Sequence, residues 1–433
     1  INPLGLSIQT EKGKQFFDGI LHISDQFIIL ELEPIYFQEA NNVLSFYHLV
    51  KAPIARIKKA GSFRELCQVI VKEVHNLTGF DRVMLYQFDA EGAGKVVAEA
   101  QPENLPPLLG LHYPALDIPP LARQLFIQNS LRFIPDVNYQ PVKFVSQQNL
   151  TTEQPLDLSL SVLRSASPCH LQYLKSMGVA ASMTISLVRE QKLWGLIACH
   201  HQTPKSVSYG VRHSCELLGK VMALEIGNQE NNEDLNYKGT LKSLQSQLVA
   251  DISQADSFTD GLLQEEEKLL QLVSAQGAVV CANENLKLIG KTPDLSEIKN
   301  LVTWLEKQLN QSFFATDSLA KLYPAAEQFK DVASGLLAIS ISKMPKHYIL
   351  WFRQEVIHTV NWAGDPHQSV EIELDGSLRL SPRNSFELWQ ETVRLKSLPW
   401  KPCEIEMALE LRVAMLGLEL RKLNEDLESR VQQ

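Results

Sequence analysis

The segment Ser167–His170 (Ser-Pro-Cys-His) contains the residues best suited to covalent chemistry. Ser167 is a favourable N-cap and the proline after it suits the first helical position, so the sequence predicts a helix over residues 168–177. Gly178 suits the C-terminal cap of this helix. Cys169 then falls in the first turn, where the helix dipole favours a thiolate, which is a prepared nucleophile.

Several roles are open to Cys169. A buried cysteine often packs as a small apolar residue, and that role would suit most cysteines. A protease-like pair with His170, or a metal bound by the two, is disfavoured because adjacent helical side chains point about 100° apart. The remaining role is a thiol that bonds an electrophilic ligand, beside an imidazole that touches the same ligand. Tyr173, one turn further on, is expected on the same helix face.

Asp117 is the second candidate. It lies in the segment Tyr113–Pro119 between proline-restrained stretches, which hold it in a fixed pose. The alternative is an ordinary aspartate in a surface turn, and the local sequence alone favours that alternative.

Two arginines and two hydroxyl residues could bind a ligand that carries carboxylates. Arg132 and Arg164 stand beside apolar residues, and Ser182 and Thr184 alternate on one face of a predicted strand. Ordinary surface charge and a polar sheet face are the alternatives. His200 ends another predicted strand, and only a place beside Cys169 would make it more than a satisfied polar residue.

The elements that must position these residues alternate between strands and helices. Residues 6–10, 16–23 and 27–33 read as strands, and three strands without covering helices predict the tail of a larger sheet. We therefore expect a fragment whose natural N-terminus lies further upstream. Further elements are expected as helices over 47–59, 63–78, 210–250 and 403–433, and as strands over 82–88, 183–189 and 192–200. A long proline-rich insertion spans 101–160.

The composition excludes several classes of protein. The chain has 433 residues, 45% of them hydrophobic, and a net charge of −9 with scattered Lys and Arg, which argues against nucleic acid as a partner. No apolar run is long enough to cross a bilayer. The six cysteines include no CxxC pair, so neither a disulfide framework nor a zinc site is expected. We expect a reducing, cytoplasmic compartment instead.

Four stretches carry a family resemblance through their order and spacing: Thr78–Tyr86, Asp117–Pro119, Leu163–Ser165 ahead of Cys169, and Leu193–His201. Together they resemble the bilin-binding GAF domain of phytochromes, in the style of cyanobacterial phytochromes. The resemblance extends over nearly the whole chain. It implies an α+β, multidomain fold, in which antiparallel sheets with flanking helices are joined by long helices.

The implied domains are the C-terminal part of a PAS domain over 1–45, a bilin-binding GAF domain over 46–230, a PHY domain over 231–402 and a signalling, coiled-coil helix over 403–433. The PHY domain would carry a tongue over about 355–392.

The resemblance implies a role for each candidate residue. Cys169 would form a thioether to the bilin, while Asp117, Ile118 and His170 would contact it near its pyrrole nitrogens. Carboxylate groups would be bound by Arg132, Arg164, Ser182 and Thr184, and the D-ring carbonyl by His200. Tyrosines would pack around the rings, or simply in the core: Tyr86, Tyr113 and Tyr173.

The implied function is a red/far-red photoreceptor that switches between two photostates. A cysteine at 169, without the upstream cysteine of bacteriophytochromes, favours phycocyanobilin or a similar linear tetrapyrrole over biliverdin. The fragment would catalyse only its own chromophore attachment, and its parent would be a dimeric sensor histidine kinase in two-component signalling with a response regulator. The alternatives are a non-covalent GAF sensor of a small ligand such as a cyclic nucleotide, an enzyme with Cys169 as nucleophile, and a scaffold.

Three positions depart from the family pattern: Leu108 replaces a usual tyrosine, Gln87 an arginine and Leu116 a serine. These departures bear on colour tuning and photoproduct stability.

Two further segments suggest signalling. Residues 369–374 and 377–381 read as strands around the turn Asp375-Gly376, while Asn384 and Glu387 resemble a capping box before a helix over 386–395. The tongue thus carries signals for both strand and helix, and the resemblance pairs its Arg383 with Asp117.

The C-terminal helix shows a heptad seam that predicts a parallel dimer, with packing on its own PHY domain as the alternative. The seam consists of Leu409, Val413, Leu416, Leu420, Leu423 and Leu427.

Overall fold

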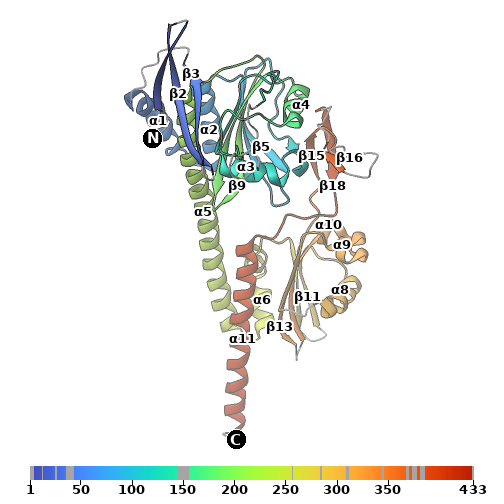
Figure 1. Cartoon of the computed structure of the whole chain (residues 1–433). Helices are drawn as coiled ribbons and strands as arrows, with labels where there is room; N and C mark the ends of the chain where they lie inside the picture. The colour runs from blue at the N-terminus through green and yellow to red at the C-terminus, as the bar shows by residue number, and fades with distance from the viewer. Residues whose placement is uncertain are drawn as a thin grey trace. The chain divides into compact units, whose positions relative to one another are not determined.

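The computed structural model describes most of the chain. The described residues are 4–11, 13–24, 27–35, 43–143, 156–255, 257–282, 285–308, 312–343, 346–366, 370–372, 378–380 and 386–431. Two compact units divide it, one formed by residues 1–231 with 360–391 and the other by 232–359 with 392–433. The helix α5 (Tyr209–Gln254) contributes to both units (Figure 1). The multidomain α+β class expected from the sequence is confirmed.

The chain opens with a three-stranded antiparallel sheet made of β1 (Leu4–Thr10), β2 (Gly13–Ser24) and β3 (Phe27–Pro34). The three strands match the predicted ones. Glu31 on β3 accepts hydrogen bonds from the backbone N–H groups of Val162 (2.9 Å) and Leu163 (2.7 Å). This sheet is therefore tied to the loop that precedes the Ser-Pro-Cys-His segment.

The centre of the first unit is an eight-stranded sheet with the order β18-β15-β6-β5-β4-β9-β8-β7. Residue Trp362 on β15 pairs in parallel with His112 on β6, so the segment from β15 to β18 extends the edge of the sheet. The strands are β4 (Arg82–Phe88), β5 (Gly94–Ala100), β6 (His112–Tyr113), β7 (Leu131–Ile134), β8 (Ala181–Arg189), β9 (Lys192–His201), β15 (His358–Ala363) and β18 (Leu388–Val393).

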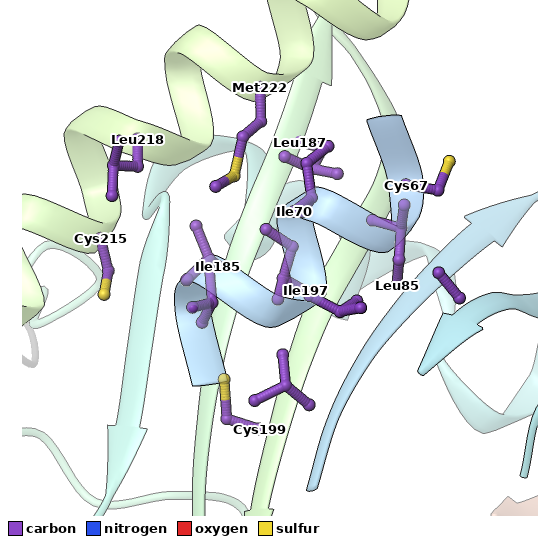
Figure 2. Packing of buried hydrophobic residues seen from close by; sticks show 14 of the residues in the cluster. Cys67, Ile70, Leu85, Ile185, Leu187, Ile197, Cys199, Cys215, Leu218 and Met222 are labelled. Carbon is purple, nitrogen blue, oxygen red and sulfur yellow. The ribbon is translucent and has the colours of Figure 1, made fainter. Parts of the chain in front are cut away.

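One face of this sheet is covered by α2 (Phe63–Thr78) and the first half of α5, next to α1 (Val43–Ile57). Figure 2 shows Ile70 of α2, Ile185 of β8 and Met222 of α5 meeting in this core, and all three are fully buried. The sequence sets the ends of α2 directly. The Ser62 hydroxyl caps its start by accepting from the N–H of Glu65, and Gly79 ends it in the left-handed conformation.

The opposite face carries the polar candidates. The short turn η1 (Ala115–Asp117) leads into α3 (Pro120–Gln128), and α4 (Pro168–Ser176) precedes β8. These elements form two smaller apolar clusters with the strands. The turn η1 and helix α3 lie within the proline-rich insertion, and α4 is the predicted helix that begins at the Ser-Pro-Cys-His segment.

The second unit is built on a five-stranded sheet with the order β11-β10-β14-β13-β12. Trp351 and Phe352, adjacent on β14, face opposite apolar cores on the two sides of this sheet. Its strands are β10 (Gly277–Ala282), β11 (Asn285–Gly290), β12 (Phe313–Thr316), β13 (Gly335–Lys343) and β14 (Lys346–Arg353). Its further helices are α6 (Phe258–Gln264), α7 (Glu266–Gln271), α8 (Leu295–Gln308), α9 (Leu319–Leu322), η2 (Pro324–Phe329), α10 (Lys330–Ala333) and α11 (Pro402–Val431).

The last helix, α11, packs along β13 within the second unit (Figure 1). Leu409 and Leu416 of the predicted seam pack against the unit's own core, whereas Val413 (64%) and Leu420 (62%) are exposed. The side chains of Leu423 and Leu427 lie outside the described residues. The first part of the seam is thus shared between the domain's core and solvent.

The tongue was expected to carry signals for both strand and helix over 386–395, and this structure shows the strand: residues 388–393 form β18. Pairing with β15 supplies the backbone partners, and the indole of Trp362 donates to Glu391 at 2.8 Å. The predicted hairpin has its strands in place as β16 (Val370–Ile372) and β17 (Leu378–Leu380), which pair antiparallel. The predicted domain boundaries stay predictions.

Candidate functional site

A cavity of about 600 Å³ opens on the α3 and α4 face of the eight-stranded sheet. Its volume lies in the range of sites for drug-sized organic ligands. The predicted site residues that line it are Tyr86, Tyr113, Asp117, Ile118, Arg132, Cys169, His170, Tyr173, Ser182, Thr184 and His200. The fold thus gathers eleven of the residues singled out from the sequence around one cavity.

Cys169 is the second residue of α4 and its side chain is exposed at the cavity. Ser167 stands at the N-cap as expected, but its hydroxyl forms no capping hydrogen bond. The rings of His170 and Tyr173 are stacked at a centroid distance of 6.5 Å, as the spacing of three residues on a helix dictates. A reachable thiol and two stacked rings therefore share one helix end.

Asp117 closes the turn η1 and lies against α4. Its carboxylate accepts a hydrogen bond from the Tyr173 hydroxyl at 3.1 Å, and its N–H donates to the carbonyl of Pro114 at 3.1 Å. Burial, followed by the charge of Asp117, raises the pKa of Tyr173 well above its usual value, so this phenol stays a donor. The proline-framed turn thus fixes the carboxylate at the cavity.

Two neutral imidazoles face the cavity. Burial lowers the pKa of His170 to about 4, with a further contribution from the positive charge of Arg132. Burial lowers the pKa of His200 to about 3, helped by Arg82, its backbone partner across the sheet. Each ring is therefore uncharged at neutral pH, with one nitrogen that donates and one that accepts.

His200 has unused hydrogen-bonding capacity. Its Nδ1 is buried, and no partner for it is found in the part of the chain that the structure describes. Because an unsatisfied buried polar atom destabilises a protein, this nitrogen suits a ligand that completes the pair. Ser182, the backbone partner of His200 on β8, adds a hydroxyl beside it in the cavity wall.

The two predicted arginines differ in position. Arg132 on β7 pairs with Thr184 on β8 and lines the cavity, and burial together with the charge of Arg164 lowers its pKa. Arg164 is not among the cavity-lining residues that the structure describes, and its guanidinium donates to the carbonyls of Leu158 and Ser159. Its predicted ligand contact stays a prediction, and Arg383 lies outside the described residues.

The apolar wall was mostly missed from the sequence. Met84 precedes Tyr86 by two residues on β4, and Leu196 and Ala198 precede His200 on β9, so strand alternation places them on the cavity side. That alternation was the available signal. Val96 of β5 also lines the cavity, and further lining residues come from turns, loops and helix faces: Leu116, Pro119, Ala122, Leu125, Phe126, Ser167, Leu174 and Met177.

Two described residues of the stretch from β15 to β18 lie beside the cavity-lining side chains. The ring of Phe386 meets that of Tyr173 edge-on at 5.0 Å, and Ala363 is buried in the apolar cluster that contains Tyr86 and Tyr113. Leu108, one of the departures from the family pattern, packs against this cluster too. Phe386 and Ala363, both of the first unit, therefore pack next to residues that line the cavity.

The donor set suits an organic ligand. The apolar wall, the Asp117 carboxylate, two neutral imidazoles and the Arg132 cation together suit a ligand that carries apolar, hydrogen-bonding and carboxylate groups. Within the described ranges, no group of three or more metal-ligating side chains occurs, and no helix has the length and hydropathy to span a membrane.

Comparisons with known proteins agree on one family. The model of the GAF domain matches residues 62–229, and the model of the phytochrome region matches residues 241–424. Cyanobacterial phytochrome A of Nostoc sp. is 52% identical over 429 residues, which cover 98% of this chain and 56% of that protein. The chain thus spans about half the length of the curated relatives it matches.

Two solved structures share the fold. The bacteriophytochrome RpBphP3 of R. palustris matches with a TM-score of 0.84 and 40% identity, over 97% of this chain and 84% of that one. The phytochrome photosensory core module of Stigmatella aurantiaca matches with a TM-score of 0.80 and 43% identity, over 97% and 83%.

Proposed function

Since this chain belongs to the phytochrome family of photoreceptors, whose members bind linear tetrapyrroles, we propose that it holds such a bilin covalently on Cys169 and switches between two photostates. The observation that carries this proposal is the exposed thiol of Cys169 at the rim of a cavity with two neutral imidazoles. The thiol would add across a carbon–carbon double bond of the bilin's A-ring side chain: the π bond breaks, sulfur bonds one of its two carbons, and the proton from the thiol ends on the other.

The residues present fit this cofactor. The buried Nδ1 of His200, for which the described residues supply no partner, suits a hydrogen-bonding ligand, and Arg132 presents a partly buried cation to carboxylates. The Asp117 segment and His170, which line the cavity, offer acceptors to the pyrrole N–H groups. When bound, the bilin supplies light absorption and a double bond that isomerises.

The chain's own residues would convert that isomerisation into a change of protein state. His200 would hold a carbonyl in one state and lose it in the other, while the Asp117–Tyr173 hydrogen bond would reorganise. Phe386, in contact with Tyr173, would carry the change into the tongue. Arg383 would pair with Asp117 in one of the two states.

The finer identity rests on family resemblance. We infer phycocyanobilin or a similar bilin, red/far-red switching, a cytoplasmic location, and a homodimer that controls a histidine kinase and its response regulator. Biliverdin is the less favoured cofactor because Cys169 occupies the GAF attachment position.

Coexpression with a bilin supply tests the proposal. We expect a coloured protein whose red absorbance falls under red light and returns under far-red light. A colourless chain that instead binds a small ligand without need of Cys169 would favour the non-covalent GAF sensor. Turnover of a substrate that requires Cys169, without colour, would favour an enzyme.

A further inference from the structure

Arg123 lies close to the cavity without lining it. It belongs to the first turn of α3, directly after the proline-framed turn that carries Asp117. Its charge is not used in the proposed function, and its three side-chain hydrogen bonds all go to main-chain carbonyls. A guanidinium placed in this way fixes backbone rather than ligand.

The hydrogen bonds of Arg123 bracket Asp117. Its Nε donates to the carbonyl of Ile118 at 2.7 Å, and its Nη2 donates to the carbonyl of Ala115 at 3.1 Å. These carbonyls lie on either side of the carboxylate residue. The same Nη2 donates to the carbonyl of Gly92 at 2.5 Å, which ties the turn to the loop between β4 and β5.

The β4–β5 loop is shaped around this side chain. The Arg123 guanidinium lies 4.7 Å from the centre of the Phe88 ring, where a cation is attracted to the aromatic face. Gly92 has a left-handed φ of +88°, and a Cβ there would come within 2.5 Å of Arg123 Nη1. A side chain at this position would therefore displace the guanidinium, and the positive φ also favours glycine.

We propose that Arg123 is a positioning residue for the photoreaction: it holds the Ala115–Ile118 turn so that Asp117 keeps its place at the bilin. This inference rests on the proposed function for its photochemical part. We call the hydrogen bonds of Arg123 to the carbonyls of Gly92, Ala115 and Ile118 the clamp. Without it, the turn would sample other conformations and the Asp117–Tyr173 hydrogen bond would be made less often. The switched state would then form poorly.

Two variants disturb the clamp from opposite sides. Arg123→Lys keeps the charge but cannot serve three carbonyls in a planar fork. Gly92→Ala leaves Arg123 intact and pushes it away. Their matched controls are Gln124→Ala, at an exposed neighbour on α3, and Gly13→Ala, which has a similar φ of +111° and no atom within 4 Å of its Cβ position.

Two measurements are made on each protein. Hydrogen exchange of peptides covering residues 113–118, in the chain without bilin, should speed up about tenfold in Arg123→Lys and Gly92→Ala and stay unchanged in both controls. After assembly with phycocyanobilin, covalent attachment should stay at the wild-type level, while the photoproduct fraction under saturating red light should fall below about half of the wild-type fraction.

The outcomes separate the inference from the proposed function. Unchanged exchange in both clamp variants, or increased exchange with a full photoproduct fraction, would overturn the positioning role of Arg123. A wild-type chain that takes up no bilin would overturn the proposed function and the photochemical role with it, whereas the exchange comparison would still report whether Arg123 holds the turn.

Discussion

A buried ion pair in the second unit allows the change in unfolding free energy on mutation to be predicted in magnitude. Arg353 at the end of β14 is 5% exposed and Glu404 in the first turn of α11 is 2% exposed. Arg353 donates to Glu404 at 2.8 Å and to the carbonyls of Val273 (2.7 Å) and Pro399 (2.6 Å). Glu404 also accepts from the hydroxyl of Tyr237 at 2.8 Å.

The change is Arg353→Met, which keeps the apolar stem and removes the cation. Glu404 would then be a buried charge without its partner, and breaking such a pair costs about 3–5 kcal/mol of unfolding free energy. The double variant Arg353→Met with Glu404→Gln removes both charges and should lose clearly less than the single variant. The matched control is Lys238→Met, whose pair with Glu406 is 44% and 47% exposed, so that losing it should change the unfolding free energy little.

The assay is hydrogen exchange of peptides from β13 and β14 at increasing urea, which reports the opening free energy of this unit separately from the other. The opening free energy should fall strongly in Arg353→Met, less in the double variant and hardly at all in Lys238→Met. Equal losses in Arg353→Met and Lys238→Met would refute the reasoning.

The remaining predictions concern pH, assembly and the tongue. Without bilin, the unfolding free energy should fall as pH drops below 6.5, because His170 and His200 take up protons in the unfolded chain there but only near about 4 and about 3 in the folded chain. For His170 the full effect is roughly 3 kcal/mol. Urea titrations at several pH values check this, and an equal dependence of the unfolding free energy on pH in the wild type and in the double variant His170→Gln with His200→Gln would contradict it. Val413→Glu with Leu420→Glu, at the two exposed positions of the seam, should halve the sedimentation mass, and an unchanged mass would speak against a dimer made by α11. Arg383→Ala should weaken the light-minus-dark amide infrared signal of the tongue, so a full signal with a normal photoproduct would remove the proposed coupling to Asp117.

Local chemistry explains which parts of the structure were predictable. Ser62 and Gly79 mark the ends of α2, and alternation marks β8 and β9, because caps and strand periodicity act between near neighbours. Residues 386–395 carried a capping signal for a helix, yet Leu388–Val393 is a strand next to β15. Long-range pairing overrode the local signal there.

The same limit applies to the site. Asp117 and His200 looked ordinary in their own segments, and only the fold brings them to one cavity with Cys169. Arg164 looked equivalent to Arg132, but its direction is set by the carbonyls of a nearby loop. Arg123 escaped notice because its partners are main-chain carbonyls, which leave no signature in the residue types.

The central claim is a covalent bilin on Cys169, and zinc-induced fluorescence on a denaturing gel tests it most directly. The wild-type chain and the control Cys403→Ala, at a half-buried thiol of the second unit, should both give a fluorescent band after assembly with phycocyanobilin, whereas Cys169→Ala should give none. A Cys169→Ala band as bright as that of the wild type would contradict the account.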